Sequence, residues 1–293
     1  MKILLSSLLT VLSLQLSASN WSLTDKDKGW NQRDLVQLYF HNSELQTQWA
    51  WEALSHYKIQ GNEQILDFGS GDGKISSLMS YMVSEGSVTG IDLSKEMTLF
   101  ASKMFPHKNL SFLQSSDVDF SSFELGKKFD LVTSFCVFHL TPNPMTIFSH
   151  LREIISNEGV FLGAVPAGGN PTLFKVVSSE MAKYGLNFPK PSAGTISVRT
   201  AEGLKAFLEA SGFEIEHLEL VKSRFPFSSK EELVDWFEGT SAANWNIPND
   251  IRHAFFTAVT DQYFEECPWE IDEDGFCYFY LNRLDFVARP TKD

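Results

Sequence analysis

The residues whose types and spacing could do chemistry begin in the stretch 65–74, which reads ILDFGSGDGK and places its glycines directly after a short, mainly apolar run. Gly69, Gly71 and Gly73 occupy alternate positions in it. A strand that bends sharply into a helix, with a ligand lying against the bend, needs residues that tolerate positive φ and let another group approach the backbone closely. Glycine does both, so this stretch predicts a turn that cradles a nucleotide-like ligand.

The spacing of the glycines separates two kinds of nucleotide turn. A dinucleotide fingerprint, G-x-G-x-x-G, would place its third glycine at position 74, where this chain has Lys74. The spacing here is G-x-G-x-G, which counts against a nicotinamide reductase. A second acidic position, Asp92, stands at the end of the next expected strand. A carboxylate there can accept both hydroxyls of a ribose.

With Asp67 before the first glycine and Asp92-Leu93 after the second strand, this pattern resembles the first two motifs of class I S-adenosylmethionine-dependent methyltransferases. The stretches 129–140 and 157–160 resemble the fourth-strand motif and the turn before the fifth strand of that family. The resemblance implies S-adenosyl-L-methionine as the cofactor. The cofactor-binding residues that it implies are Asp67, Gly69, Ser70, Gly71, Gly73, Asp92, Leu93, Asp117, Val118 and Ser134.

The resemblance also assigns a role to several of these residues. Asp67 would orient the turn or accept a hydrogen bond from the ammonium group, and Asp92 would bind the ribose. Leu93 would pack on the adenine ring, whose amino group would donate to Asp117 or its neighbour Ser116. Val118 would offer a backbone donor to the same ring.

A narrower resemblance extends over most of the chain. The Trp30-Asn31 pair, the segment 39–54, the helix start at 199–202 and the C-terminal stretch 248–289 are similar to trans-aconitate and juvenile hormone acid methyltransferases. Both families esterify carboxylates, so the resemblance implies a small acidic acceptor and methyl ester formation. Gln46 departs from it, because an arginine often stands in this region of the aconitate enzymes, and this weakens the case for a polyanionic acceptor.

Four side chains are candidates for positioning the acceptor: Tyr39, Gln46, His139 and Arg199. Arg199 would clamp a carboxylate, and His139 follows the fourth strand, at the end where ligands of parallel sheets bind. Trp49 also fits this group, although a core position explains it equally well. Two other functions stay open from the sequence: a catalytically silent protein that binds the cofactor, and methylation of nitrogen or phenolic oxygen.

The elements that must position these residues alternate regularly along the chain. Apolar runs predict strands at 64–68, 87–91, 110–114, 129–135, 160–165, 213–221 and 276–288, and helical periodicity predicts helices at 30–57, 75–82, 94–104, 142–155, 173–184, 200–211, 228–237 and 248–266. Parallel neighbours need a crossover, which is usually helical. The sequence therefore predicts an α/β fold with a doubly wound, mostly parallel seven-stranded sheet, N-terminal helices and an inserted cap or lid at 167–199.

Composition restricts the partners. A formal charge of −13 provides no basic field for the phosphate backbone, which argues against nucleic acid as a partner. The partner that the resemblance implies is a small-molecule acceptor, and we expect a monomer or homodimer. Cys136, Cys267 and Cys277 lack the close spacing of a metal site, and a bond between the last two is left open.

The first residues of the chain point in another direction. Residues 1–19 combine Lys2, an apolar stretch and small residues, which is typical of an export signal, and any membrane association would depend on them. The supply of S-adenosylmethionine instead favours the cytoplasm, and we expect the enzyme to work there.

Overall fold

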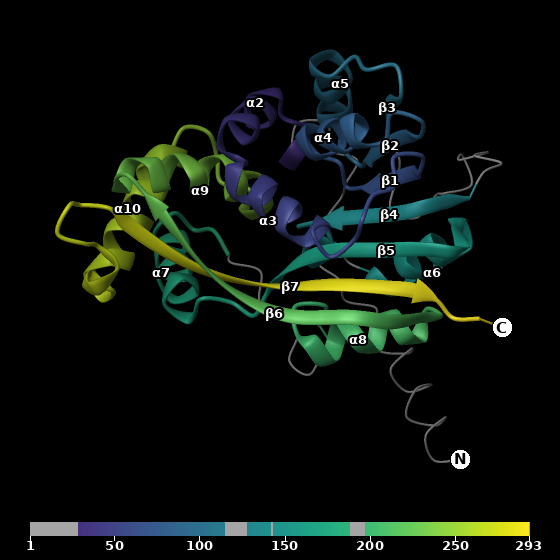
Figure 1. Ribbon diagram of the computed structural model, residues 1–293. Coiled ribbons are helices and arrows are strands. Elements are labelled where there is room, and N and C mark those ends of the chain that lie inside the picture. Colours follow the sequence, from purple (N-terminus) through teal and green to yellow (C-terminus); the bar gives the residue numbers. More distant parts are fainter. Residues whose placement is uncertain (1–28, 115–127, 142, 188–196, 293) are drawn as a thin grey trace.

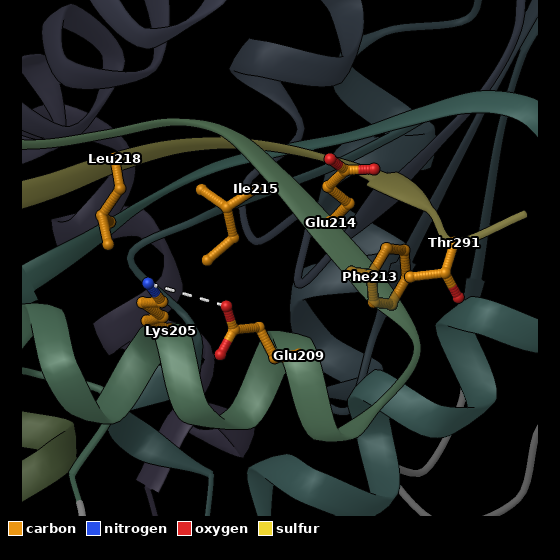
Figure 2. A pocket seen from close by; sticks show the side chains of 7 residues that line it. All are labelled: Lys205, Glu209, Phe213, Glu214, Ile215, Leu218 and Thr291. Atoms are coloured by element: carbon orange, nitrogen blue, oxygen red, sulfur yellow. Dashed lines mark ion pairs between the residues drawn. The ribbon is translucent and has the colours of Figure 1, made fainter.

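A seven-stranded sheet forms the centre of the computed structural model, which describes residues 29–114, 128–141, 143–187 and 197–292 (Figure 1). The strand order is β3-β2-β1-β4-β5-β7-β6. All neighbours from β3 to β5 pair in parallel, and β7 is antiparallel to both β5 and β6. The strands are β1 (Gln64–Phe68), β2 (Ser87–Asp92), β3 (Leu110–Gln114), β4 (Phe129–Phe135), β5 (Ile155–Ala167), β6 (Phe213–Phe227) and β7 (Cys277–Pro290). The predicted fold class is confirmed.

Helices cover both faces of this sheet. They are α2 (Arg33–Asn42), α3 (Glu44–Leu54), α4 (Lys74–Met82), α5 (Lys95–Met104), α6 (Pro144–Ile154), α7 (Pro171–Lys183), α8 (Ala201–Ala210), α9 (Lys230–Trp245) and α10 (Arg252–Glu266), with 3-10 turns η1 (Gly29–Asn31), η3 (Phe138–Leu140) and η4 (Pro268–Glu270). Apolar residues of α3 and α4 pack on one face of the sheet, and those of α6 and α8 pack on the other. Alternate residues of each strand serve the two faces, since successive side chains point to opposite sides.

A second apolar core lies beyond the carboxyl ends of the parallel strands. It is formed by α7, α9 and α10 together with parts of α2 and α3 and the far ends of β6 and β7. Figure 1 shows α7, α9 and α10 gathered past the tip of β4, with β6 and β7 extending out to them. The sequence predicted a cap from 167–199 only. Its α7 packs against α10. Both α9 and α10, which connect β6 to β7, were predicted as helices but not as parts of the same core.

Several element boundaries differ from the predicted ones for a common reason. β6 and β7 pair continuously from Phe213 opposite Pro290 to Phe227 opposite Cys277, so each supplies the hydrogen-bond partners of the other where the apolar pattern has already ended. β5 likewise begins at Ile155, before the glycine that was expected to start it. The predicted single or double helix at 30–57 is two helices that meet at Ser43.

The ends of two other helices were also misplaced. The helix predicted from 228 to 237 runs from Lys230 to Trp245, and α10 begins at Arg252 rather than at Pro248. By contrast, Ser94 and Thr200 cap α5 and α8 as predicted, because each side chain accepts a backbone N–H of the first turn.

Two further expectations concern bonding and the membrane. Cys267 and Cys277 are buried and free, so the disulfide that the sequence left open is not formed. Among the described residues, no helix is long and apolar enough to cross a membrane. Residues 1–19 lie outside the described part of the chain, and the predicted export signal stays a prediction.

A buried ion-pair network connects α3 to the sheet. Arg283 and Asp285 lie two residues apart on β7, with the Arg283 Nε 2.7 Å from the Asp285 Oδ1. Glu52 of α3 places its Oε2 2.8 Å from the Arg283 Nη2. The Asp285 side chain is completely buried, so the guanidinium provides the compensating charge for it. Burial alone lowers the pKa of Arg283, but the bonds to Asp285 and Glu52 outweigh it and raise the pKa.

We predict that Arg283→Met lowers the free energy of unfolding by about 3–5 kcal/mol, because it leaves the buried Asp285 carboxylate without a cation. Urea unfolding followed by circular dichroism measures the loss. Glu52→Gln is the matched control, since the Glu52 side chain is 42% exposed and its pairing should contribute less than about 1 kcal/mol. Equal losses in the two variants would contradict the assignment of Asp285 as the group that depends on Arg283.

Candidate active site

The glycine turn between β1 and α4 leaves open space at one of its three glycines. Gly69, Gly71 and Gly73 have φ of +77°, +51° and +84°. A Cβ on Gly69 would lie 2.2 Å from a methyl group of Val137, and one on Gly73 would lie 2.7 Å from Ala101. Beside Gly71 the nearest atom would be a ring carbon of Tyr39 at 3.8 Å. The outer glycines are therefore required by packing, and the middle one gives a ligand access to the backbone.

Asp92 lies beside this opening and holds the backbone of Gly71 in place. Its Oδ2 accepts the Gly71 N–H at 2.9 Å, and its Oδ1 accepts the Ser94 N–H at 2.8 Å. Burial raises the pKa of the Asp92 carboxyl, and these two N–H donors oppose the shift. Each oxygen keeps a lone pair for a further donor, which suits a ribose diol. Leu93 follows directly and is half-buried, as a residue flanking a ring would be.

Two predicted cofactor contacts are used inside the protein instead. Asp67 is 2% exposed, with its Oδ2 accepting the Ser76 hydroxyl at 2.5 Å and its Oδ1 the Thr133 hydroxyl at 3.0 Å. Of its two expected roles, orienting the turn fits this arrangement. Ser134 is fully buried and donates its hydroxyl to the Phe68 carbonyl at 3.0 Å. This hydrogen bond connects β4 to β1, and the role of Ser134 in cofactor binding stays a prediction.

Burial also raises the pKa of the Asp67 carboxyl, to about 6, although the hydroxyls of Ser76 and Thr133 oppose the shift. The backbone N–H groups of Gly69 and Ser70 bind the carbonyl of Ile91, at 2.8 and 2.9 Å. Ser70 is thus placed by the second strand, and its side chain is 8% exposed. The predicted adenine contacts Asp117 and Val118 lie outside the described residues.

The N-terminal helices are fastened onto this turn by residues that the sequence analysis missed. The Asp72 Oδ2 accepts the Ser43 hydroxyl at 2.8 Å, at the junction of α2 and α3. The Lys74 ammonium donates to the same hydroxyl at 3.0 Å and to the Phe40 carbonyl. Asp72 stands between two of the glycines, and that position was the available signal. These contacts hold α2 and α3 over the cofactor side of the sheet.

Tyr39 closes the same region. Its ring meets Trp30 edge-on, with centroids 5.2 Å apart, and it lies beside Gly71. Burial raises the pKa of its phenol well above the usual value, and the neighbouring charges of Asp72 and the other carboxylates of the turn add to the shift. The phenol is therefore neutral and available as a hydrogen-bond donor.

His139 and Arg199 lie together at the carboxyl ends of neighbouring strands. His139 belongs to η3, directly after β4, and the Arg199 carbonyl accepts the N–H of Gly168, directly after β5, at 2.8 Å. Burial lowers the pKa of His139 to about 3, and the positive charge of Arg199 contributes to this shift. The His139 Nδ1 and the Arg199 Nε are both buried without a hydrogen-bond partner in the described structure. This pair can bind an anion that also accepts hydrogen bonds.

Gln46 and Trp49 are two further candidates for the acceptor region, and both lie on α3. They lie three residues apart on α3, hence on one side of it, and the Gln46 Oε1 and Trp49 Nε1 are buried without partners in the described structure. Trp49 also packs against Phe225 and under the Arg283 guanidinium. Within the described residues, no direct bond joins Gln46 to His139 or Arg199. The arrangement thus has a cofactor half on β1 and β2 and a polar, partly unpaired half on β4, β5 and α3.

Comparison with known proteins identifies the family of this chain. Residues 40–218 match the family model described as a methyltransferase domain, which is more than half of the chain. The chain belongs to this methyltransferase family. It is an enzyme of the S-adenosylmethionine-dependent kind, as the glycine turn and Asp92 predicted.

The individual relatives have low sequence identity to this chain, but the alignments cover most of both proteins. The methyltransferase is 23% identical to the trans-aconitate 2-methyltransferase of Escherichia fergusonii, over 87% of this chain and 97% of the relative. It is 23% identical to the juvenile hormone acid O-methyltransferase of Drosophila melanogaster, over 77% of this chain and 81% of the relative.

A solved structure shares the fold. It is a phosphoethanolamine N-methyltransferase 2 of Haemonchus contortus with bound S-adenosylhomocysteine, at a TM-score of 0.57 and 14% identity. The match covers 93% of this chain and 61% of that one.

The residues of this methyltransferase fit the cofactor at the points that the structure allows to be tested. The opening at Gly71 admits a ligand against the backbone, and Asp92 offers two acceptors for a diol. The sulfonium and ammonium groups of S-adenosylmethionine are cationic, and Asp67, Asp72 and Asp92 surround the turn with carboxylates. The cofactor supplies an electrophilic methyl group, and the protein supplies its binding and orientation.

Asp92→Ala should weaken S-adenosylmethionine binding about 10- to 100-fold, because it removes two charge-assisted acceptors that are held in place by the backbone. Isothermal titration calorimetry measures the affinity. Asp130→Ala is the matched control: Asp130 also accepts a backbone N–H, from Gln64, but at the opposite end of the sheet, so binding should be unchanged. Undiminished affinity in Asp92→Ala would remove Asp92 from the site.

The stability of this methyltransferase should fall as the pH rises through the titration of Asp67. Its pKa is about 6 in the fold, above the ordinary value of 3.8, so the folded state binds the proton more tightly than the unfolded chain does. Ionising Asp67 therefore costs nothing below about pH 4 and about 2–3 kcal/mol above pH 6. Asp67→Asn lacks this cost.

We expect the stability of the wild type relative to Asp67→Asn to decline by that amount between pH 4 and pH 7, in urea unfolding without cofactor. A difference that stays constant or increases with pH would contradict the raised pKa.

Proposed function

We propose that this methyltransferase transfers the methyl group to a carboxylate oxygen of a small molecule and forms a methyl ester. The observation that supports this most directly is the Arg199 guanidinium near His139, at the carboxyl ends of β4 and β5, whose buried Nε has no hydrogen-bond partner among the described residues and which lies over the Phe174 ring. In the described structure no acidic side chain lies within ion-pair distance of Arg199, and only burial shifts its pKa, downward. A half-buried cation without a counter-ion is costly, and an anionic acceptor would compensate it.

A carboxylate needs little chemical help in this reaction. It is already a nucleophile when ionised, so a strong general base is not required. His139 has a pKa of about 3 and is neutral near pH 7, which suits a hydrogen-bonding role rather than proton transfer. The rate gain must come from holding the acceptor oxygen in line with the methyl group and from excluding water. Arg199, His139, Tyr39 and Gln46 are the side chains to which we assign this positioning.

The names of two relatives support a carboxylic acid as the acceptor. The side chains of the site favour an acceptor with a single negative charge. Trans-aconitate and juvenile hormone acid, which name the two relatives, are both carboxylic acids. On α3, Gln46 supplies an amide and no charge toward the interior. Arg199 is then the cation to which one acceptor carboxylate would bind, so a monocarboxylic acid with an apolar body fits better than a polyanion. The apolar body would lie against the side chains of the core beyond β4 and β5.

A product assay with methyl-labelled cofactor over panels of carboxylic acids, amines and phenols tests the proposal. We expect a base-labile methyl ester with monocarboxylic acids and no product with amines. Labelled product from amines or phenols alone would overturn the choice of acceptor atom. If the cofactor binds but no panel gives S-adenosylhomocysteine, the proposal of catalysis on these acceptors fails.

Arg199→Ala should raise the KM for the acid acceptor at least 10-fold while the affinity for S-adenosylmethionine, measured by calorimetry, stays within about twofold. The reason is that a charge-assisted bond to a desolvated carboxylate contributes about 1.5–3 kcal/mol. Arg33→Ala is the matched control, since Arg33 is an exposed arginine at the start of α2. An unchanged KM in Arg199→Ala would place the acceptor carboxylate elsewhere.

A further inference from the structure

A cluster of side chains of the kind that bind metal ions lies at the β6 edge of the sheet, away from the cofactor turn after β1. His56 follows the end of α3, and His217 and Glu219 lie on β6. Their ligand atoms, one per residue, are all within 4.8 Å of one another. The two imidazole rings stack with centroids 4.1 Å apart, and the His217 Nε2 is 3.5 Å from a Glu219 oxygen. Neither the glycine turn nor the acceptor region uses these residues.

A bulge in β6 brings the two β6 ligands onto the face that α3 covers. The register against β7 shifts between Ile215 and His217, so one extra residue is inserted at Glu216. Before the bulge, Phe213 packs in the core on the α8 side, and after it Leu218 does. The alternation of faces therefore shifts by one residue after the bulge, so that His217 and Glu219 point to the face opposite Phe213 and Leu218.

The β7 residues opposite them confirm this placement. His217 pairs with Val287, which belongs to the core under α3, and Glu219 pairs with Asp285. His56 reaches the same place because the chain leaves α3 through a turn, in which the His56 N–H binds the Ala53 carbonyl at 3.1 Å.

The side chains of the cluster are not all bonded to one another or sealed from solvent, so an ion could reach them. The His217 Nε2 is buried and has no hydrogen-bond partner among the described residues, although the residue as a whole is only half-buried. His56 and Glu219 are exposed, which leaves solvent access and free rotation. A completely buried carboxylate, Asp285, has its Oδ2 4.0 Å from the His56 Nε2. Carboxylates in this position behind a histidine commonly orient the ring of a metal ligand.

We propose that His56, His217 and Glu219 form a binding site for a transition-metal dication, with Zn²⁺ as the best match. Two imidazole nitrogens and one carboxylate oxygen are a ligand set typical of zinc, and they leave a fourth position for water. Ligand atoms of a tetrahedral zinc site are about 3.3 Å apart, so small rotations of the exposed side chains close the present spacing.

The metal would connect the end of α3 to the edge strand β6. α3 carries Gln46 and Trp49, so the site would fix the helix that faces the acceptor region. This proposal does not depend on the identity of the acceptor, and its test uses no activity assay.

Calorimetric titration of ZnCl₂ into the chelator-treated full chain tests the site. We expect one ion per chain, and at least 10-fold weaker binding in His56→Ala and in His217→Ala. His253→Ala is the matched control, because His253 is exposed and lies near two carboxylates, Glu231 and Glu238, but has no second imidazole beside it. Its affinity should equal that of the wild type.

Thermal unfolding separates the site from a folding defect. In chelator, His56→Ala should unfold at the temperature of the wild type, since His56 is exposed. In Zn²⁺, only the wild type and His253→Ala should gain stability. Absence of binding to the wild type overturns the proposal. So does stoichiometric binding that persists in both histidine variants, which would assign the metal to other groups such as the free cysteines.

Discussion

The attachment of the glycine turn to the end of β2 is the constraint on which the rest of the site depends. The turn binds the Ile91 carbonyl through two N–H groups, and Asp92 accepts the Gly71 N–H while it also caps the chain at Ser94. Ser94 in turn donates its hydroxyl to the Trp30 carbonyl, which positions η1 and α2. The cofactor cradle and the lid of N-terminal helices are thus built from one continuous set of hydrogen bonds that starts at β2.

This dependence explains why the cofactor half could be predicted and the acceptor half only partly. Gly69, Gly71 and Gly73 are required by backbone conformation and by close packing, which are local constraints that leave a pattern in the sequence. Arg199 and His139 are sixty positions apart, and only the adjacency of β4 and β5 brings them together. Their identity as candidates came from the family resemblance and from the end of the sheet at which they were expected.

Two side chains of the expected motifs show what a motif cannot specify. Asp67 and Ser134 stand where the sequence predicted them, and their oxygens bind within the sheet and to α4, which a sequence pattern does not reveal. The β6 bulge has the same character, since it reverses the face of every later residue without any mark in the apolar pattern. The length of β6 was missed because its outer half pairs with β7 and because its apolar residues there, Phe225 and Phe227, pack in the core that α9 and α10 form, far from the residues that predicted the strand.

Charge is distributed so that the two halves of the site favour opposite ligands. Carboxylates of Asp67, Asp72 and Asp92 surround the turn, and Arg199, which has no acidic partner among the described residues, lies on the acceptor side. The whole chain carries a formal charge of −13, which would repel an acidic acceptor if it acted over the full molecule. At physiological ionic strength, however, exposed charges are screened beyond about 8 Å, whereas a buried guanidinium acts through a medium of low dielectric constant. A single half-buried cation can therefore decide the sign of the field that an acceptor meets inside the site, and the acidic surface affects mainly the rate of encounter.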